Sequence, residues 1–339
     1  MPTLKEKRTI EPGNVKMKGS RLSIGIDLGG TKIAGILVND CLDILAFEKI
    51  PVDPERRVEV VLQDIIRLGQ SLLDQIPDQK QFSGMGIALP GLLDLERGMM
   101  IFSENLNWRN IEVMKYLRER LPVSLYLEHD VRSGAIAETF FGAGREFQDI
   151  AYVSVGTGIS GTLIWHRNII RGVRGTSAEI GHTNIEPNGP LCRCGNAGCL
   201  EALASGSAME RDAYHLLKEK VRGEVILERA KNHVSPYYEI VKKAAGYLGL
   251  ALANLAEIFD PQVIILGGGV AEAGDFWLDL VKASYYEHLT GSQQLPDIFL
   301  GTFKGKASVM GAAGLPYLKE ERAIDQKRTG YSDDTPPQS

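Results

Sequence analysis

The sequence predicts an α/β protein made of two similar lobes. Residues 22–38 give a β-hairpin signal, because two apolar runs flank a Gly-Gly-Thr turn. The same arrangement returns at residues 151–165, where apolar runs flank Gly156-Thr157-Gly158. Each hairpin is followed by segments of helical periodicity and by short, fully apolar strands. The repetition indicates one α/β lobe around each hairpin.

Hydrophobic periodicity places the remaining elements. Apolar residues at helical spacing predict helices over residues 58–73, 111–121, 133–140, 241–259 and 307–318. Short apolar runs predict strands over residues 84–89, 123–127 and 263–266. The second of these runs leads into Glu128-His129-Asp130, so we expect Asp130 at a strand-to-helix junction. The carboxyl ends of strands are where α/β folds place their chemistry.

Composition and charge exclude several classes of protein. The 339 residues are 44% hydrophobic and 24% charged, which is typical of an ordered globular protein with room for two lobes. A net charge of -5 gives no general field for a polyanion, so no nucleic-acid partner is expected. The sequence contains neither a run of about 18 apolar residues nor a signal peptide. We therefore expect a cytoplasmic protein without a membrane partner.

Both ends of the chain lack an apolar pattern. Residues 1–21 are rich in Lys and Arg and contain two prolines. We interpret them as a disordered leader rather than as a functional basic arm. Residues 320–339 are charged and polar, so they predict a disordered tail.

One block combines a histidine with three of the four cysteines. His182 is followed closely by Cys192, Cys194 and Cys199. One imidazole and three thiolates match the ligand set of a structural zinc site. The crowding favours a metal over a disulfide framework or three separate surface thiols. Because four protein ligands leave no position for water, we predict a structural ion and not a catalytic one.

Glycine turns indicate phosphate binding. In Asp27-Leu28-Gly29-Gly30-Thr31-Lys32 the glycines let backbone N–H groups approach an anion, but such a turn is equally typical of an ordinary hairpin. The second turn, Gly156-Thr157-Gly158, favours phosphate, and Gly267-Gly268-Gly269 after a buried strand is a natural place for a nucleoside. No Walker A sequence is present at these turns, and GTGISG at 156–161 leads into a returning strand rather than into the helix of a Rossmann fingerprint, which argues against P-loop and Rossmann proteins.

Over residues 22–318 the chain resembles the ROK family of bacterial sugar kinases and sugar-responsive repressors. The resemblance rests on DLGGTK at 27–32, PGLLD at 90–94, ENL at 104–106, the Asp130 region, GTGISG at 156–161, EIGH at 179–182, CRCGNAGCLE at 192–201 and LGGG at 266–269. It implies a two-lobed fold of the actin and hexokinase type with a cleft between the lobes. The expected division is a leader at 1–21, an N-terminal lobe at 22–142, a C-terminal lobe at 143–303 with a zinc-binding insertion at 182–199, a helix at 304–319 that returns to the first lobe, and a tail at 320–339.

The resemblance also implies an activity, namely ATP-dependent phosphorylation of a hexose, at O6 as in glucokinases. Asp130 would be the general base. The implied sugar-binding residues are Gly91, Asn105, His129, Asp130, Glu179, His182 and Glu201, with His182 also a zinc ligand. ATP would be bound by Asp27, Gly29, Gly30, Thr31, Lys32, Gly156, Thr157, Gly158, Gly267, Gly268 and Gly269, with Mg²⁺ near Asp27. Dimers are common among relatives, so a homodimer is the expected assembly.

Two positions depart from the family's pattern. The residue before the catalytic Asp is usually Asn in the family's glucokinases, and a second Asn commonly follows two residues after it. Here these residues are His129 and Arg132. An imidazole is bulkier than an amide and offers its donor and acceptor on different edges, so we hypothesise a non-glucose or relaxed hexose preference. In the alternative interpretation His129 turns away from the pocket and is purely structural.

Two functions of different classes remain open at this point. The first is a hexose kinase, and the second is a regulatory protein that senses sugar without turnover. The family's repressors normally carry an N-terminal winged-helix domain, for which residues 1–21 are too few, so direct DNA binding is not expected. The presence of Asp130 favours catalysis, because binding alone does not require a base.

Overall fold

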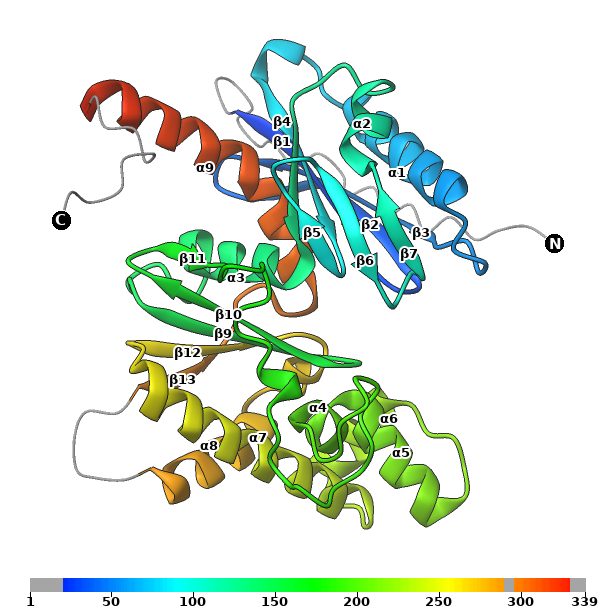
Figure 1. Ribbon diagram of the computed structural model, residues 1–339, viewed down its shortest axis with the longest axis vertical. Coiled ribbons are helices and arrows are strands. Elements are labelled where there is room, and N and C mark those ends of the chain that lie inside the picture. Colours follow the sequence, from blue (N-terminus) through cyan, green and yellow to red (C-terminus); the bar gives the residue numbers. More distant parts are fainter. Residues whose placement is uncertain (1–20, 290–295, 330–339) are drawn as a thin grey trace. The chain divides into compact units, whose positions relative to one another are not determined.

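The computed structural model describes residues 21–289 and 296–329, with side chains as far as Leu318. The chain divides into two compact units (Figure 1). Residues up to Asp130 and those from Val309 onward form the first unit, and Val131–Ser308 form the second. The predicted leader, apart from Arg21, and the last part of the predicted tail lie outside the described residues.

The first unit is built on a five-stranded sheet. Its strands are β1 (Leu22–Leu28), β2 (Lys32–Asn39), β3 (Ile44–Pro51), β4 (Phe82–Leu89) and β8 (Leu125–His129). They lie in the order β3-β2-β1-β4-β8, with β1, β4 and β8 parallel and the other neighbouring pairs antiparallel. The sheet confirms the predicted hairpin at residues 22–38.

Helix α1 (Val58–Leu73) packs on one face of this sheet. Its buried residues fall at helical spacing, which is the pattern that predicts it. Gly35 on β2 gives this helix room, because a Cβ there would lie 2.9 Å from Leu68 Cγ. The 3-10 helix η1 (Gln79–Gln81), a three-stranded sheet of β5 (Leu92–Asp94), β6 (Met99–Ser103) and β7 (Trp108–Ile111), and helix α2 (Val113–Arg118) complete the described part of this stretch. Because Ile111 belongs to β7, α2 is shorter than the predicted helix at 111–121.

Helix α9 (Ala307–Thr329) packs on the opposite face of the same sheet (Figure 1). Gly25 and Gly86 are paired in register on β1 and β4, and both face this helix. A Cβ at Gly86 would overlap the carbonyl oxygen of Ala312. The helix therefore approaches the sheet as closely as backbone allows. It also continues to Thr329, past the predicted start of a disordered tail at residue 320.

We expect Gly86→Ala to destabilise the first unit by about 3 kcal/mol or more, because backbone on both sides has to move. Scanning calorimetry would show a lower transition temperature. Gly246→Ala is a matched control, since a Cβ at this helical position meets nothing within 4 Å and Ala favours a helix over Gly. Equal transition temperatures for the two variants would contradict the close packing of α9.

The second unit repeats the topology of the first. Its sheet consists of β9 (Ile150–Val155), β10 (Ile159–Trp165), β11 (Asn168–Ile170), β12 (Val263–Gly267) and β13 (Asp297–Leu300). The order is β11-β10-β9-β12-β13, with β9, β12 and β13 parallel and the other neighbouring pairs antiparallel. Strand for strand this is the arrangement of the first unit, so the predicted duplication is confirmed.

Helices cover both faces of the second sheet. Helix α3 (Asp130–Phe141) lies on the face that includes Tyr152, and α7 (Tyr237–Phe259) and α8 (Asp275–His288) belong to the core on the other face. The remaining described helices are η2 (Ile180–His182), α4 (Leu200–Ala204), α5 (Gly206–Leu217), α6 (Gly223–Lys231), η3 (Val270–Ala273) and η4 (Lys304–Lys306). Over residues 21–289 and 296–329, no helix is both long and apolar enough to cross a membrane.

Candidate functional site

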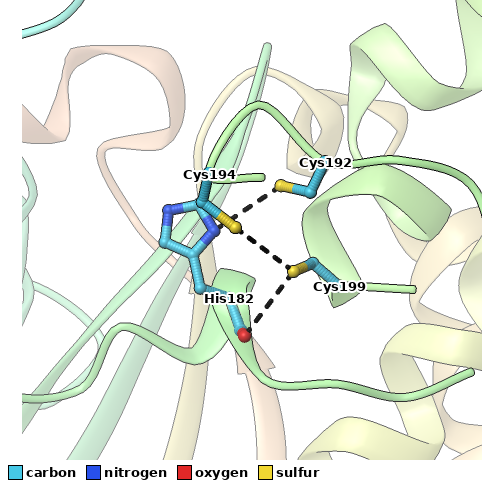
Figure 2. Close-up of side chains that lie close together, drawn as sticks. All are labelled: His182, Cys192, Cys194 and Cys199. Carbon is cyan, nitrogen blue, oxygen red and sulfur yellow. Dashed lines mark hydrogen bonds between the residues drawn. The ribbon is translucent and has the colours of Figure 1, made fainter. Parts of the chain in front are cut away.

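His182, Cys192, Cys194 and Cys199 come together as the sequence predicts (Figure 2). One ligand atom from each lies within 4.8 Å of all the others. Cys194 Sγ is 3.6 Å from Cys199 Sγ, and Cys192 Sγ is 3.7 Å from His182 Nδ1. Metal–sulfur bonds of about 2.3 Å in a tetrahedron place two sulfurs about 3.8 Å apart. The four side chains can therefore hold one tetrahedral metal ion with little movement.

The thiols differ in their surroundings. Burial raises the pKa of Cys199 to about 12, and it also raises the pKa of Cys192. The pKa of Cys194 is lowered, mainly because its sulfur accepts a hydrogen bond from the backbone N–H of Asn196. Two thiols thus keep their protons at neutral pH unless a cation displaces them, and metal binding at this cluster would release protons.

The loop that carries the cysteines is folded onto itself by backbone hydrogen bonds. Gly198 O accepts from Ile185 N and Glu186 N, and Gly198 N donates to Pro190 O. Gly198 has φ of 73°, and a Cβ there would overlap Glu186 O, so glycine is required at this position. Tyr247 on α7 donates to Glu186 Oε2 at 2.6 Å. These bonds hold the ligand-bearing loop against the second unit.

Glu179 and His182 lie at the two ends of one short turn. His182 N donates to Glu179 O at 3.0 Å, and η2 begins at the residue after Glu179. Gly181 in this turn packs directly on β10, because a Cβ there would overlap Ile159 O. Ala178, immediately before the turn, has φ of 62°, an uncommon conformation for a residue with a Cβ. The two predicted sugar ligands are thus fixed to the start of β10.

The turn at Gly156, Thr157 and Gly158 joins β9 to β10. Gly156 N donates to Gly158 O at 2.9 Å and closes the turn. A Cβ at Gly156 would lie 3.9 Å from Gly269 N. The second unit therefore brings together two of the predicted nucleotide-binding segments.

The space available for a side chain differs among the three glycines at 267–269. A Cβ at Gly267 would overlap the Tyr152 hydroxyl, and one at Gly268, which has φ of 84°, would overlap Val155 O. Both positions are explained by packing. A Cβ at Gly269 would meet nothing within 4 Å. Of this run, Gly269 is the position with open space beside it.

Glu201 joins this group from α4. It lies two residues after Cys199 of the His182–cysteine cluster, and its Oε2 accepts from Ile159 N at 3.0 Å. Ile159 is the first residue of β10 after the glycine turn. The sequence predicts Glu201 as a sugar ligand, but nothing in its local sequence predicts this bond, since the partners lie 42 residues apart.

In the first unit, the residues at 27–32 form the corresponding turn between β1 and β2. Gly29 N donates to Lys32 O at 2.9 Å, and Gly30, Thr31 and Lys32 are exposed. Arg56 Nη2 donates to Gly30 O at 3.4 Å. No local pattern predicts this cation beside the turn, because Arg56 lies in a loop with no motif. Its φ of 52° and the hydrogen bond from Trp108 Nε1 to its carbonyl fix that loop.

Asp130 lies where the sequence predicts, since β8 ends at His129 and α3 begins at Asp130. Its side chain is 30% exposed. His129 Nδ1 is 3.2 Å from Asp130 Oδ1. The imidazole therefore contacts the predicted base itself, which neither sequence interpretation of His129 included.

The other predicted positions are placed as follows. Arg132 is buried, and its guanidinium donates to Gly175 O in the loop that leads to Glu179. Gly91 follows β4 with φ of 113°, and a Cβ there would overlap Phe102 O. Asn105 lies in the exposed turn between β6 and β7. The buried Arg132 side chain therefore binds a backbone carbonyl within the second unit and does not act as an amide facing a ligand would.

Two units with the same strand order and glycine turns define the class of actin-like, hexokinase-like ATPase folds. The family model of the ROK family matches residues 23–317. The chain belongs to the ROK family. This confirms the resemblance drawn from the motifs.

Relatives within this family include both kinases and repressors. A glucokinase of Thermotoga maritima is 31% identical over 314 residues, which cover 86% of this chain and 96% of that protein. The crystal structure of a ROK family glucokinase from Streptomyces griseus in complex with glucose and AMPPNP has a TM-score of 0.78 at 30% identity, covering 87% of this chain and 98% of that chain. A xylose repressor of Bacillus subtilis is 30% identical over 315 residues, covering 88% of this chain and 81% of the repressor.

Proposed function

We propose that this protein is an ATP-dependent sugar kinase that transfers the γ-phosphoryl group to the O6 hydroxyl of a hexose or hexose derivative. The observation that carries the proposal is Asp130, a partly exposed carboxylate at the carboxyl end of β8, in contact with an imidazole. Similarity to glucokinases over nearly the whole of their length supports it. A regulator that only binds sugar would need no general base.

The glycine turns would bind the nucleotide. The turn at 27–32 in the first unit and the turn at 156–158 in the second offer backbone N–H groups to phosphate oxygens. Gly269 is the open glycine that would allow the nucleoside to approach backbone. Asp27 would hold Mg²⁺ through water molecules. When bound, the ion would neutralise part of the phosphate charge.

Glu179, His182 and Glu201 would bind sugar hydroxyls. We propose zinc as the metal at the cysteine cluster, because the ligand set and the spacing of the sulfurs suit tetrahedral zinc. His182 presents Nδ1 to the cluster, which leaves Nε2 for a sugar hydroxyl. Zinc would thus fix the orientation of a ring that also binds substrate.

The reaction needs one proton transfer. Asp130 accepts the proton of the sugar hydroxyl while the oxygen attacks the γ-phosphorus, and the bond from that phosphorus to the β–γ bridging oxygen breaks. The products are the sugar phosphate and ADP. His129 would donate its Nδ1–H to Asp130 Oδ1 and so hold the carboxylate in one orientation.

The proposal is tested by ADP release with Mg²⁺ and ATP across a panel of hexoses and amino sugars. We expect turnover with at least one sugar and the sugar phosphate as product. If the protein binds a sugar but phosphorylates no member of the panel, the regulatory function is favoured instead. The similarity to a xylose repressor supports that alternative.

We expect His129→Asn to change the sugar preference. The imidazole contacts the base and, through Nε2, can read a hydroxyl that an amide would read differently. The ratio of kcat/KM for glucose to that for the best non-glucose sugar should rise by about tenfold. The measurement is kcat/KM for each sugar in the panel.

His166→Asn provides the control, because His166 is an exposed histidine on a turn of the second sheet and outside the proposed site. Its sugar profile should match that of the wild type. Clean glucose selectivity in the wild type, unchanged in His129→Asn, would refute the role of His129 in specificity.

A further inference from the structure

Glu201 has a contact that sugar binding does not explain. Its Oε2 accepts from Ile159 N at 3.0 Å, directly beside the glycine turn that joins β9 to β10. A Cβ at Gly158 would overlap the same oxygen. One oxygen of this carboxylate is thus committed to the turn, and the second is left for another ligand.

The start of α5, directly after the helix that carries Glu201, also holds the turn. Gly206 N, at the start of α5, donates to Gly156 O at 2.7 Å, and Ser207 N lies 3.4 Å from Thr157 O. The opposite side of Ile159 is covered by Gly181, in the turn between Glu179 and His182. The first residue of β10 is therefore held between the residues proposed to bind sugar.

We infer that Glu201 is a positioning residue for the phosphate-binding turn as well as a sugar ligand, and that it couples the two binding sites. This inference rests on the proposed function. A sugar hydroxyl that holds the carboxylate in place also holds Ile159, and with it the turn, in the geometry that presents the N–H groups of Thr157 and Gly158 to phosphate. Because coupling of binding free energies is reciprocal, a change in the turn must alter sugar binding.

The decisive variant is Gly158→Ala, which substitutes a residue of the turn and acts on sugar binding only through the Glu201 carboxylate beside it. Its Cβ would push on the far end of a flexible side chain, so the carboxylate moves and the backbone need not. Glucose, mannose and N-acetylmannosamine are titrated one at a time by calorimetry, without nucleotide. For the sugars that bind the wild type, we expect affinity to fall by about tenfold in Gly158→Ala.

A matched glycine variant outside the proposed site serves as the control for sugar binding. Gly246→Ala, on α7, should keep the wild-type sugar affinity, because its Cβ would meet nothing within 4 Å.

A second measurement separates positioning from sugar binding alone. Glu201→Asp should be too short to hold the Ile159 N–H, so we expect the KM for ATP at saturating sugar to rise by about fivefold. A sugar ligand without a positioning role would change the KM for sugar and leave that for ATP unchanged. This result, or wild-type sugar affinity in Gly158→Ala, overturns the inference and leaves the kinase proposal standing. Failure of the wild type to bind or phosphorylate any sugar of the full panel overturns both.

Discussion

Asp130→Asn should lower kcat by about 10² to 10⁴ while leaving sugar affinity within a few fold of the wild type. The amide keeps the shape of the side chain and one acceptor oxygen, but it cannot take a proton from the attacking hydroxyl. The loss should therefore appear in kcat and, to a similar extent, in kcat/KM. The measurement is ADP release at saturating ATP with the best sugar of the panel, together with calorimetric sugar binding.

Asp74→Asn is the matched control, because Asp74 is an exposed residue at the end of α1, outside the proposed site. It should retain wild-type kcat. If Asp130→Asn kept more than about a tenth of wild-type kcat, Asp130 would not be the general base. Loss of sugar affinity together with kcat would instead assign Asp130 chiefly to substrate binding.

The position of Asp130 and the clustering of His182 with the three cysteines could be predicted because both are encoded locally. A strand signal followed at once by a helical pattern puts Asp130 at the junction, and the structure has it there. The three cysteines lie within eight residues of chain, Cys192 to Cys199, so tight turns suffice to bring their sulfurs together. His182 is joined to them by one further loop. Local patterns of this kind do not depend on how distant segments pack.

Other features of the site depend on long-range packing, and no local pattern reports them. The bond between Glu201 and Ile159 joins residues 42 positions apart, and the contact of Arg132 with Gly175 joins residues 43 apart. The rotamer that brings His129 onto Asp130 is also decided by the packed structure. These contacts arise only once the sheet and its helices have formed.

Two parts of the fold also lack a local signal in the sequence. Strand β3 shows no alternation of buried and exposed residues, because most of its side chains are half-buried at the edge of the sheet. Gly25 and Gly86 could be recognised as strand residues, but the close approach of α9 to them links segments more than 200 residues apart. Helix α9 itself is predicted from residue 307, whereas its extension to Thr329 is mostly charged and polar in sequence and gives no helical pattern of apolar residues.

Loss of the metal should weaken sugar binding without touching any residue of the phosphate turns. Cys194→Ala removes an exposed ligand and leaves no buried cavity. We expect bound zinc to fall from about one ion per chain to well below that, and the KM for sugar to rise by about 10- to 100-fold. The cause is mechanical, because His182 would lose the bond that orients its ring, and Cys199 leads directly into the helix that carries Glu201.

Cys41→Ala is the matched control, since Cys41 is likewise an exposed free thiol but lies in the first unit, far along the chain from the cluster. Elemental analysis of both purified variants, with sugar KM and thermal midpoint, separates a metal effect from loss of a thiol. Purified wild-type protein that folds normally without zinc would refute the structural role of the ion. A zinc-depleted Cys194→Ala with unchanged sugar KM would show that the ion stabilises the loop alone, because the sugar ligands would then keep their geometry without it.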